Sequence, residues 1–259
     1  MNKLGQDVTI PIGYNIEGNL VTLPINKAPH ILIAGCTGSG VTNYVDSIIA
    51  SMLCRYSTNE LRLVLFDPRN SDLVKYDKIP HVLFGKAITD ASCMISILQS
   101  LIYEMESRYQ LLMNGEKGVF SDITLYNSKV DEKDKLPRII VVINEFTDLM
   151  VVNKNKFSSL ILCLAQKARA VGIHLILATD NLSIANISST IKCNLPTRIA
   201  FKTKTGSDSL TILSEIGAEK LSGQGDCLFR GIDSINTERL QTCYIASKDI
   251  EEVINKLKI

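Results

Sequence analysis

The sequence lacks an excess of charge of either sign. Its 259 residues carry 28 lysines and arginines against 27 aspartates and glutamates, which gives a formal net charge of +1. The strong positive field that draws many proteins to nucleic acid is therefore missing. If DNA is a partner, local loops must bind it. The 46% share of hydrophobic residues is typical of a globular protein and excludes intrinsic disorder.

Long apolar runs are also missing. The longest runs are the size of strands, far short of the roughly 20 residues that span a bilayer. Residues 1–11 hold no basic segment followed by an apolar core, so no signal peptide is expected there. We expect a cytoplasmic segment that makes no membrane contact itself, even where it belongs to a membrane-associated complex.

Cysteine pairs with metal-binding or redox spacing do not occur. The seven cysteines are odd in number, and no two form a C-x-x-C pair. Most lie inside apolar runs, as Cys163 does in residues 161–164. We predict reduced cysteines that fill the core, without a disulfide or zinc framework.

Short apolar runs alternate with longer segments of helical period. Such runs predict strands buried on both faces, as in a parallel sheet. Apolar residues at steps of three and four predict a helix over residues 92–112, and residues 43–54 and 155–171 are expected to be helical. The alternation predicts an α/β fold whose mostly parallel central sheet carries helices on both faces. The expected strands are His30–Ala34, Leu61–Phe66, Arg138–Ile143, Ile173–Ala178 and Thr197–Phe201.

The remaining segments are expected to extend this layer structure within one domain, residues 1–259. Residues 1–29 predict short lead-in strands, and the polar, turn-rich residues 114–136 predict a surface excursion. Residues 226–229 and 242–246 predict two further strands, followed by a helix over residues 248–259.

A glycine-rich segment follows the first strand of this series and precedes a helix. Backbone N–H groups of such a loop wrap around phosphate, and the helix dipole adds positive potential. We predict an ancestral phosphate loop rather than a mere tight turn. Its residues are Gly35, Cys36, Thr37, Gly38, Ser39, Gly40, Val41 and Thr42. Thr42 would ligate Mg²⁺, but Val41 stands where a lysine neutralises the β- and γ-phosphates, so ATP and Mg²⁺ are expected to bind with reduced affinity.

The strand at residues 138–143 ends in Asn144 and Glu145. In phosphoryl-transfer sites, the first residue of such a pair is an acid that holds the Mg²⁺ shell, and the second positions the attacking water. Asn144 is neutral and a weaker metal partner, while Glu145 keeps its carboxylate. A solvated strand end is the plain alternative, but we interpret the pair as a degenerate catalytic pair.

Long phrases of the chain resemble the motor domain of the FtsK/SpoIIIE DNA translocases. The phrases include PHILIAGCTGSG (29–40), RIIVVINEFTDLM (138–150), LAQKARAVGIHLILAT (164–179), IKCNLPTRIAF (191–201) and GAEKLSGQGDCLF (217–229). The resemblance implies a RecA-like P-loop NTPase fold, ATP as cofactor and assembly into hexameric rings on double-stranded DNA.

Departures from the family pattern concern charged positions. The family's lysine is Val41, its Walker B aspartate is Asn144, and its glutamine–arginine pair is Asp180 and Asn181. Of the basic positions that the resemblance places against DNA, only Lys192 stays basic, so DNA binding is possible but weakened.

Arg169, in the phrase QKARA, matches the family's arginine finger, which completes the site of a neighbouring subunit. A surface helix arginine is the plain alternative. The resemblance favours a degenerate ring module with weak or no hydrolysis, which acts structurally or donates Arg169 to a related module. Two alternatives stay open: an active translocase in chromosome segregation or DNA transfer, and a type VII secretion-type ATPase module that binds a substrate peptide.

Overall fold

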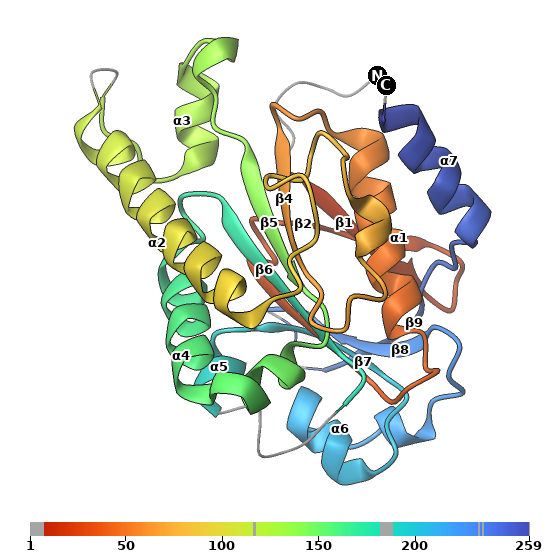
Figure 1. Cartoon of the computed structure of the whole chain (residues 1–259). Helices are drawn as coiled ribbons and strands as arrows, with labels where there is room; N and C mark the ends of the chain where they lie inside the picture. The colour runs from red at the N-terminus through yellow and green to blue at the C-terminus, as the bar shows by residue number, and fades with distance from the viewer. Residues whose placement is uncertain (1–7, 116–117, 182–188, 233, 235, 259) are drawn as a thin grey trace.

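The computed structural model describes residues 8–115, 118–181, 189–232, 234 and 236–258. Nine strands form one sheet in the order β2-β1-β9-β8-β7-β3-β6-β5-β4 (Figure 1). The strands are β1 Thr9–Tyr14, β2 Leu20–Pro24, β3 His30–Ala34, β4 Leu61–Phe66, β5 Arg138–Ile143, β6 Ile173–Thr179, β7 Thr197–Phe201, β8 Asp226–Arg230 and β9 Glu238–Gln241.

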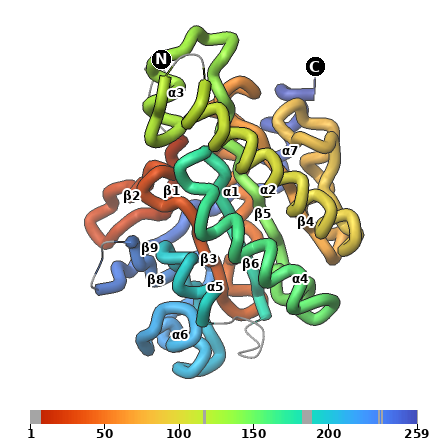
Figure 2. Tube along the Cα trace, turned by 90° about the vertical axis from the view of Figure 1, so that its left-hand side faces the viewer, coloured from red at the N-terminus to blue at the C-terminus, as the bar shows by residue number. Residues whose placement is uncertain are grey.

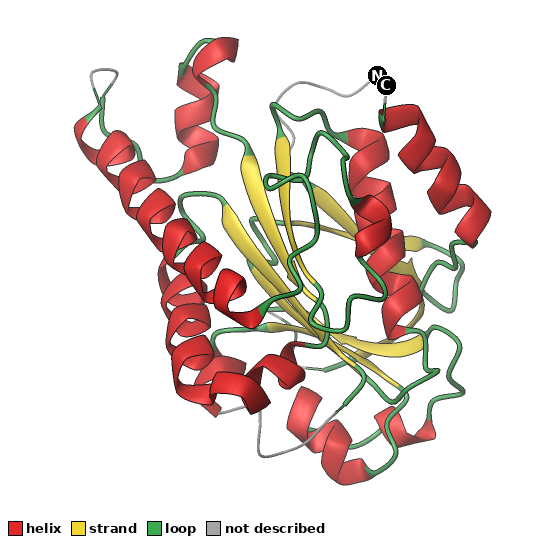
Figure 3. Ribbon diagram, viewed as in Figure 1, coloured by secondary structure: helices red, strands yellow, loops and turns green. Residues whose placement is uncertain are grey.

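Helices cover both faces of the sheet. One apolar core cluster joins α2 and α4 to the sheet, and a second joins α1 and α7 to it. Figure 3 shows the sheet between these helices, and Figure 2 shows α4 and α5 in front of it. The helices are α1 Val41–Arg55, α2 Ala91–Asn114, α3 Ile123–Lys129, α4 Phe146–Lys167, α5 Ser189–Cys193, α6 Gly206–Leu213 and α7 Ser247–Leu257.

The expected α/β fold with helices on both faces is confirmed, and the sheet is mixed. Strands β4, β5, β6, β3 and β7 are parallel neighbours, whereas β8, β9, β1 and β2 extend the sheet by antiparallel pairing. The carboxyl ends of the five parallel strands meet at one edge. Ligands of open α/β sheets bind at this edge.

Two predicted elements differ from the structure. Helix α4 begins at Phe146 instead of residue 155, because residues 146–152 already form helical turns before a break at Asn153 (φ −155°, ψ 78°). Residues 242–246 follow β9 instead of forming a strand. The side-chain amide of Asn43 holds them by accepting from the N–H of Ile245 (3.1 Å) and donating to its carbonyl (2.7 Å).

The expected surface excursion at residues 114–136, of which 116–117 lie outside the described residues, contains α3. Phe120, Ile123 and Tyr126 are buried in this segment. Residues 1–7 of the expected lead-in also lie outside the described part, and β1 and β2 follow them. Among the described helices, none combines the length and apolarity that a bilayer crossing needs.

All seven cysteines lie in the described part of the chain and are free thiols. The prediction that they fill the core is confirmed for Cys227, which is buried, and is wrong for the three exposed cysteines. Cys36, Cys163 and Cys243 are partly buried, and Cys163 packs against the core cluster of α2 and α4. Cys54, Cys93 and Cys193 are exposed on helices. An apolar neighbourhood in sequence does not place a residue on the buried face of an amphipathic helix.

Candidate functional site

The phosphate loop, residues 35–42, connects the carboxyl end of β3 to the first turn of α1. Backbone hydrogen bonds tie the loop to neighbouring segments. The N–H of Cys36 donates to the carbonyl of Lys202 (2.7 Å), and the carbonyl of Ser39 accepts from the N–H of Gly225 (2.9 Å). Gly40 has a φ of +115°, in the left-handed region. A Cβ on Gly40 would lie 2.8 Å from the nitrogen of Gly225, so only glycine fits there.

The loop offers unused polar groups. Within the described chain, no backbone acceptor is bonded to the N–H groups of Thr37, Gly38 and Gly40. The hydroxyl of Ser39 is buried without a partner. These groups suit a phosphate anion. Val41 is 3% exposed and packs in the apolar core, so the loop presents amides without a lysine charge.

Asn144 and Asp67 follow the neighbouring strands β5 and β4. The side-chain N–H of Asn144 donates to Asp72 (2.9 Å), while its Oδ1 is buried and has no hydrogen-bond partner among the described residues. Asp67 holds a turn, since its Oδ2 accepts from the backbone N–H groups of residues 71–73. Within the described part of the chain, its Oδ1 also has no partner. Two buried oxygens without hydrogen-bond donors are ligands of the kind that Mg²⁺ prefers.

Glu145 is a second buried acid at this edge, beside Asp67. Its backbone is left-handed (φ +50°) and begins α4, a strained conformation typical of functional sites. Its Oε2 accepts from the hydroxyl of Thr179 and the N–H of Asp180, both at 3.2 Å. Burial, and then the charge of Asp180, raise the pKa of Glu145 to about 7.

Arg69 connects the acids of the site. Its Nε lies 2.8 Å from Asp148 Oδ2, and its Nη1 lies 3.3 Å from both Glu145 Oε1 and Asp180 Oδ1. Asp180 in turn accepts from the hydroxyl of Thr37 in the loop (2.8 Å). Sequence reasoning did not predict this cluster, although Arg69 follows Asp67 and Pro68 at the end of an expected strand.

The raised pKa of Glu145 predicts a pH-dependent stability. In the unfolded chain the carboxyl titrates near 4.5, and in the folded chain near 7. Between these values the folded chain keeps the proton, so this group lowers the unfolding free energy as pH rises. From pH 5 to pH 8, the unfolding free energy of the wild type should therefore fall relative to that of Glu145→Gln by up to about 3 kcal/mol. Urea unfolding of both proteins at each pH measures the difference. Parallel pH profiles for the two proteins would contradict the assignment.

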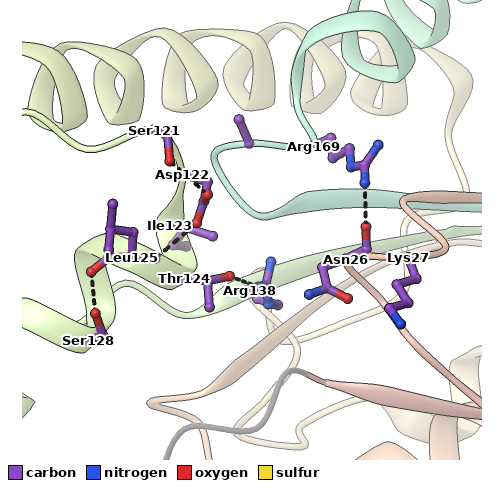
Figure 4. Close-up of a pocket in the computed structure, with 11 residues that line it drawn as sticks. Asn26, Lys27, Ser121, Asp122, Ile123, Thr124, Leu125, Ser128, Arg138 and Arg169 are labelled. Carbon is purple, nitrogen blue, oxygen red and sulfur yellow. Dashed lines mark hydrogen bonds between the residues drawn. The ribbon is translucent and has the colours of Figure 1, made fainter.

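Arg169 lies at the opposite edge of the sheet, in the turn between α4 and β6. Its Nη2 donates to the carbonyl of Asn26 (2.9 Å), ahead of β3. Figure 4 shows Arg169 with Lys27 and Arg138 around a cavity of about 680 Å³, whose other wall includes the hydroxyls of residues 121, 124 and 128. The cavity is lined by the cationic groups of Lys27, Arg138 and Arg169 and by the carboxylate of Asp122. It lies at the amino end of β3, whereas the phosphate loop follows the carboxyl end of that strand.

The predicted site residues thus divide into two groups. The loop, Asn144 and Glu145 meet at the carboxyl edge, whereas Arg169 lies at the amino edge. Lys192 is half-buried on the short helix α5, and its carbonyl accepts from Arg198 (2.9 Å).

A second cavity, of about 380 Å³, adjoins the loop at Gly40. It is walled by Asn43 of α1 and by Tyr244, which is 81% exposed. A ligand held on the loop by its phosphates can place its remaining part here. Its other lining residues are Gln224, Gly225, Thr242 and Cys243.

The chain is similar in sequence to proteins named DNA translocases. The chain is 40% identical over 257 residues to the DNA translocase FtsK of Streptococcus pneumoniae. The matched region covers 96% of this chain and 33% of that protein. It is 39% identical over 254 residues to the DNA translocase FtsK of Lactococcus lactis subsp. cremoris, covering 96% and 34%. The chain therefore spans about a third of these relatives.

Solved structures share the fold. EssC (ATPases 2 and 3) from Geobacillus thermodenitrificans superposes with a TM-score of 0.84 at 22% identity, covering all of this chain and 50% of that one. The pCW3 conjugation coupling protein TcpA, solved with ATPγS, superposes with a TM-score of 0.79 at 24% identity. The match covers 97% of this chain and 71% of that one. Residues 3–184 match the FtsK/SpoIIIE family. The chain belongs to the FtsK/SpoIIIE family and has its RecA-like α/β fold.

Proposed function

We propose that this chain is a degenerate FtsK/SpoIIIE-type module that binds nucleotide weakly, hydrolyses little or none itself, and donates Arg169 to a related module in a ring. The observation that carries the proposal is the charge arrangement at the loop. Val41 leaves the loop without a lysine, and the nearby cation Arg69 is shared by three carboxylates.

The site's own residues support binding more than catalysis. Backbone amides and the Ser39 hydroxyl can hold phosphate, and Thr42 with Asn144 and Asp67 would hold Mg²⁺, which neutralises charge on the phosphates when bound. Asn144 brings no negative charge to that ion. Glu145 can position water only after it is released from Arg69. Each of these features weakens hydrolysis without preventing the loop from holding a nucleotide.

The position of Arg169 supports action on a neighbour. The phosphate loop follows β3, whereas Asn26, whose carbonyl Arg169 contacts, precedes this strand. The five residues of β3 span roughly 16 Å at about 3.3 Å per residue. Arg169 cannot reach its own loop across that length. A neighbour's terminal phosphate could instead enter the cationic cavity of Figure 4.

The ring would act on double-stranded DNA, by analogy with relatives named DNA translocases. In such a ring this chain would contribute weak contacts through Lys192. A hexamer with active modules is the assembly that the family resemblance favours.

Calorimetric titration with Mg·ATP, with sedimentation of mixtures, tests the proposal. The loss of one charged phosphate contact should leave binding about 10- to 150-fold weaker than that of an intact FtsK-type module. The chain should co-sediment with that module. Affinity equal to the intact module's, with no co-sedimentation, would contradict both parts.

A further inference from the structure

Asp180 bridges the phosphate loop and the catalytic acid. Its Oδ2 accepts from the Thr37 hydroxyl at 2.8 Å, and its backbone N–H donates to Glu145 at 3.2 Å. The Asp180 side chain is 18% exposed. Its carboxylate therefore lies between the loop and the end of β5, and Arg69 holds its other oxygen.

The terminal phosphate of a bound triphosphate needs this same space. A phosphate loop wraps the inner phosphates, and the acid after the Walker B strand positions water for attack on the outermost one. That phosphate must therefore lie between the loop and Glu145. In the described structure, an anionic side chain lies on this side of the loop: the Thr37 hydroxyl donates to Asp180 Oδ2 (2.8 Å), and Arg69 Nη1 donates to Asp180 Oδ1 (3.3 Å).

We propose that Asp180 acts as an internal substitute for the terminal phosphate and makes this loop selective for nucleoside diphosphates over triphosphates. The proposal rests on the proposed function in one respect, that the loop accepts nucleotide. A bound diphosphate lets the Asp180 carboxylate keep its contacts with Thr37 and Arg69. A bound triphosphate has to displace the Asp180 carboxylate from both residues.

The negative charge around Arg69 also disfavours a triphosphate relative to a diphosphate. Glu145, Asp148 and Asp180 surround the single guanidinium of Arg69. An added phosphate would face like charges at short range, which costs binding free energy in a partly buried site.

Separate calorimetric titrations with Mg·ADP and Mg·ATP test the proposal on wild type and Asp180→Asn. The variant keeps the size of the side chain and removes its charge. We expect the wild type to prefer Mg·ADP, and the ratio of the two affinities to shift toward Mg·ATP by about tenfold or more in the variant. Thr37→Val, which frees Asp180 without neutralising it, should shift the ratio less. Asp249→Asn, an exposed position on α7, is the matched control.

The outcomes separate this proposal from the function proposed above. If Asp180→Asn leaves the ratio unchanged while both nucleotides bind, Asp180 does not set the selectivity and the nucleotide-binding module stands. If wild type and folded Asp180→Asn bind neither nucleotide, both proposals fail. A wild type that hydrolyses ATP rapidly, but whose ratio still shifts in Asp180→Asn, overturns only the degenerate-module proposal.

Discussion

Wild-type chain should stimulate ATP hydrolysis by an FtsK-type module whose own finger arginine has been removed, and Arg169→Ala should abolish that stimulation. An arginine supplied in trans to phosphoryl-transfer sites is worth about 10³- to 10⁵-fold in rate, so we expect a loss of at least about a hundredfold. The physical reason is position: Arg169 lies at the amino edge, in a cationic cavity with Lys27 and Arg138, away from its own loop. Steady-state phosphate release by the mixture measures the effect.

Two control variants make the result specific. Lys167→Ala removes an exposed charge from the neighbouring end of α4 and should leave the stimulation intact. Arg169→Lys keeps the charge but loses the planar guanidinium, so it should recover only part of the rate. Equal stimulation by wild type and Arg169→Ala would show that Arg169 is a surface residue.

Val41→Lys combined with Asn144→Asp should restore much of the missing phosphate and metal binding. A lysine at position 41 supplies a charge-assisted contact of about 1.5–3 kcal/mol, which corresponds to about 10- to 150-fold in affinity for Mg·ATP. Asn144→Asp replaces the N–H that bonds Asp72 at 2.9 Å by a second carboxylate oxygen. Without metal the variant should therefore be less stable than wild type. Calorimetry and thermal melts with and without Mg²⁺ measure both effects.

Val41→Met is the matched control for this experiment, because it lengthens the side chain without adding charge. It should not gain affinity for Mg·ATP. Equal gains from methionine and lysine would mean that packing beneath the loop, and not the missing charge, limits binding. If the melting temperature of Asn144→Asp is the same with and without Mg²⁺, no metal binds beside position 144.

The strands were predictable because their physics is local. Continuous apolar runs placed β3, β4, β5 and β7 at their observed bounds, since a strand buried on both faces needs apolar residues at every position. Residues 242–246 are also largely apolar, but in the described structure the β8–β9 pairing extends into them only at Thr242, whose N–H donates to the Gly225 carbonyl (2.9 Å). The Asn43 amide holds them instead, and no local pattern reveals such a contact between residues about 200 positions apart.

The site was predictable only in part. Motif spacing located the loop, Asn144 and Glu145, because the sequence order of strands and turns carries that information. The Arg69 cluster was missed because it joins Asp148 and Asp180 across the sheet edge, and only the strand order brings these residues together. The separation of Arg169 from the loop also follows from the sheet, not from the phrase that contains it.

Hydrolysis of Mg·ATP by the isolated chain, compared with Glu145→Gln at equal concentration, tests the central claim most directly. Wild type should release phosphate no faster than Glu145→Gln, because the loop lacks a lysine and Arg69 binds the Glu145 carboxylate. A wild-type rate well above that of Glu145→Gln would contradict it and identify the chain as a working ATPase with a rewired site.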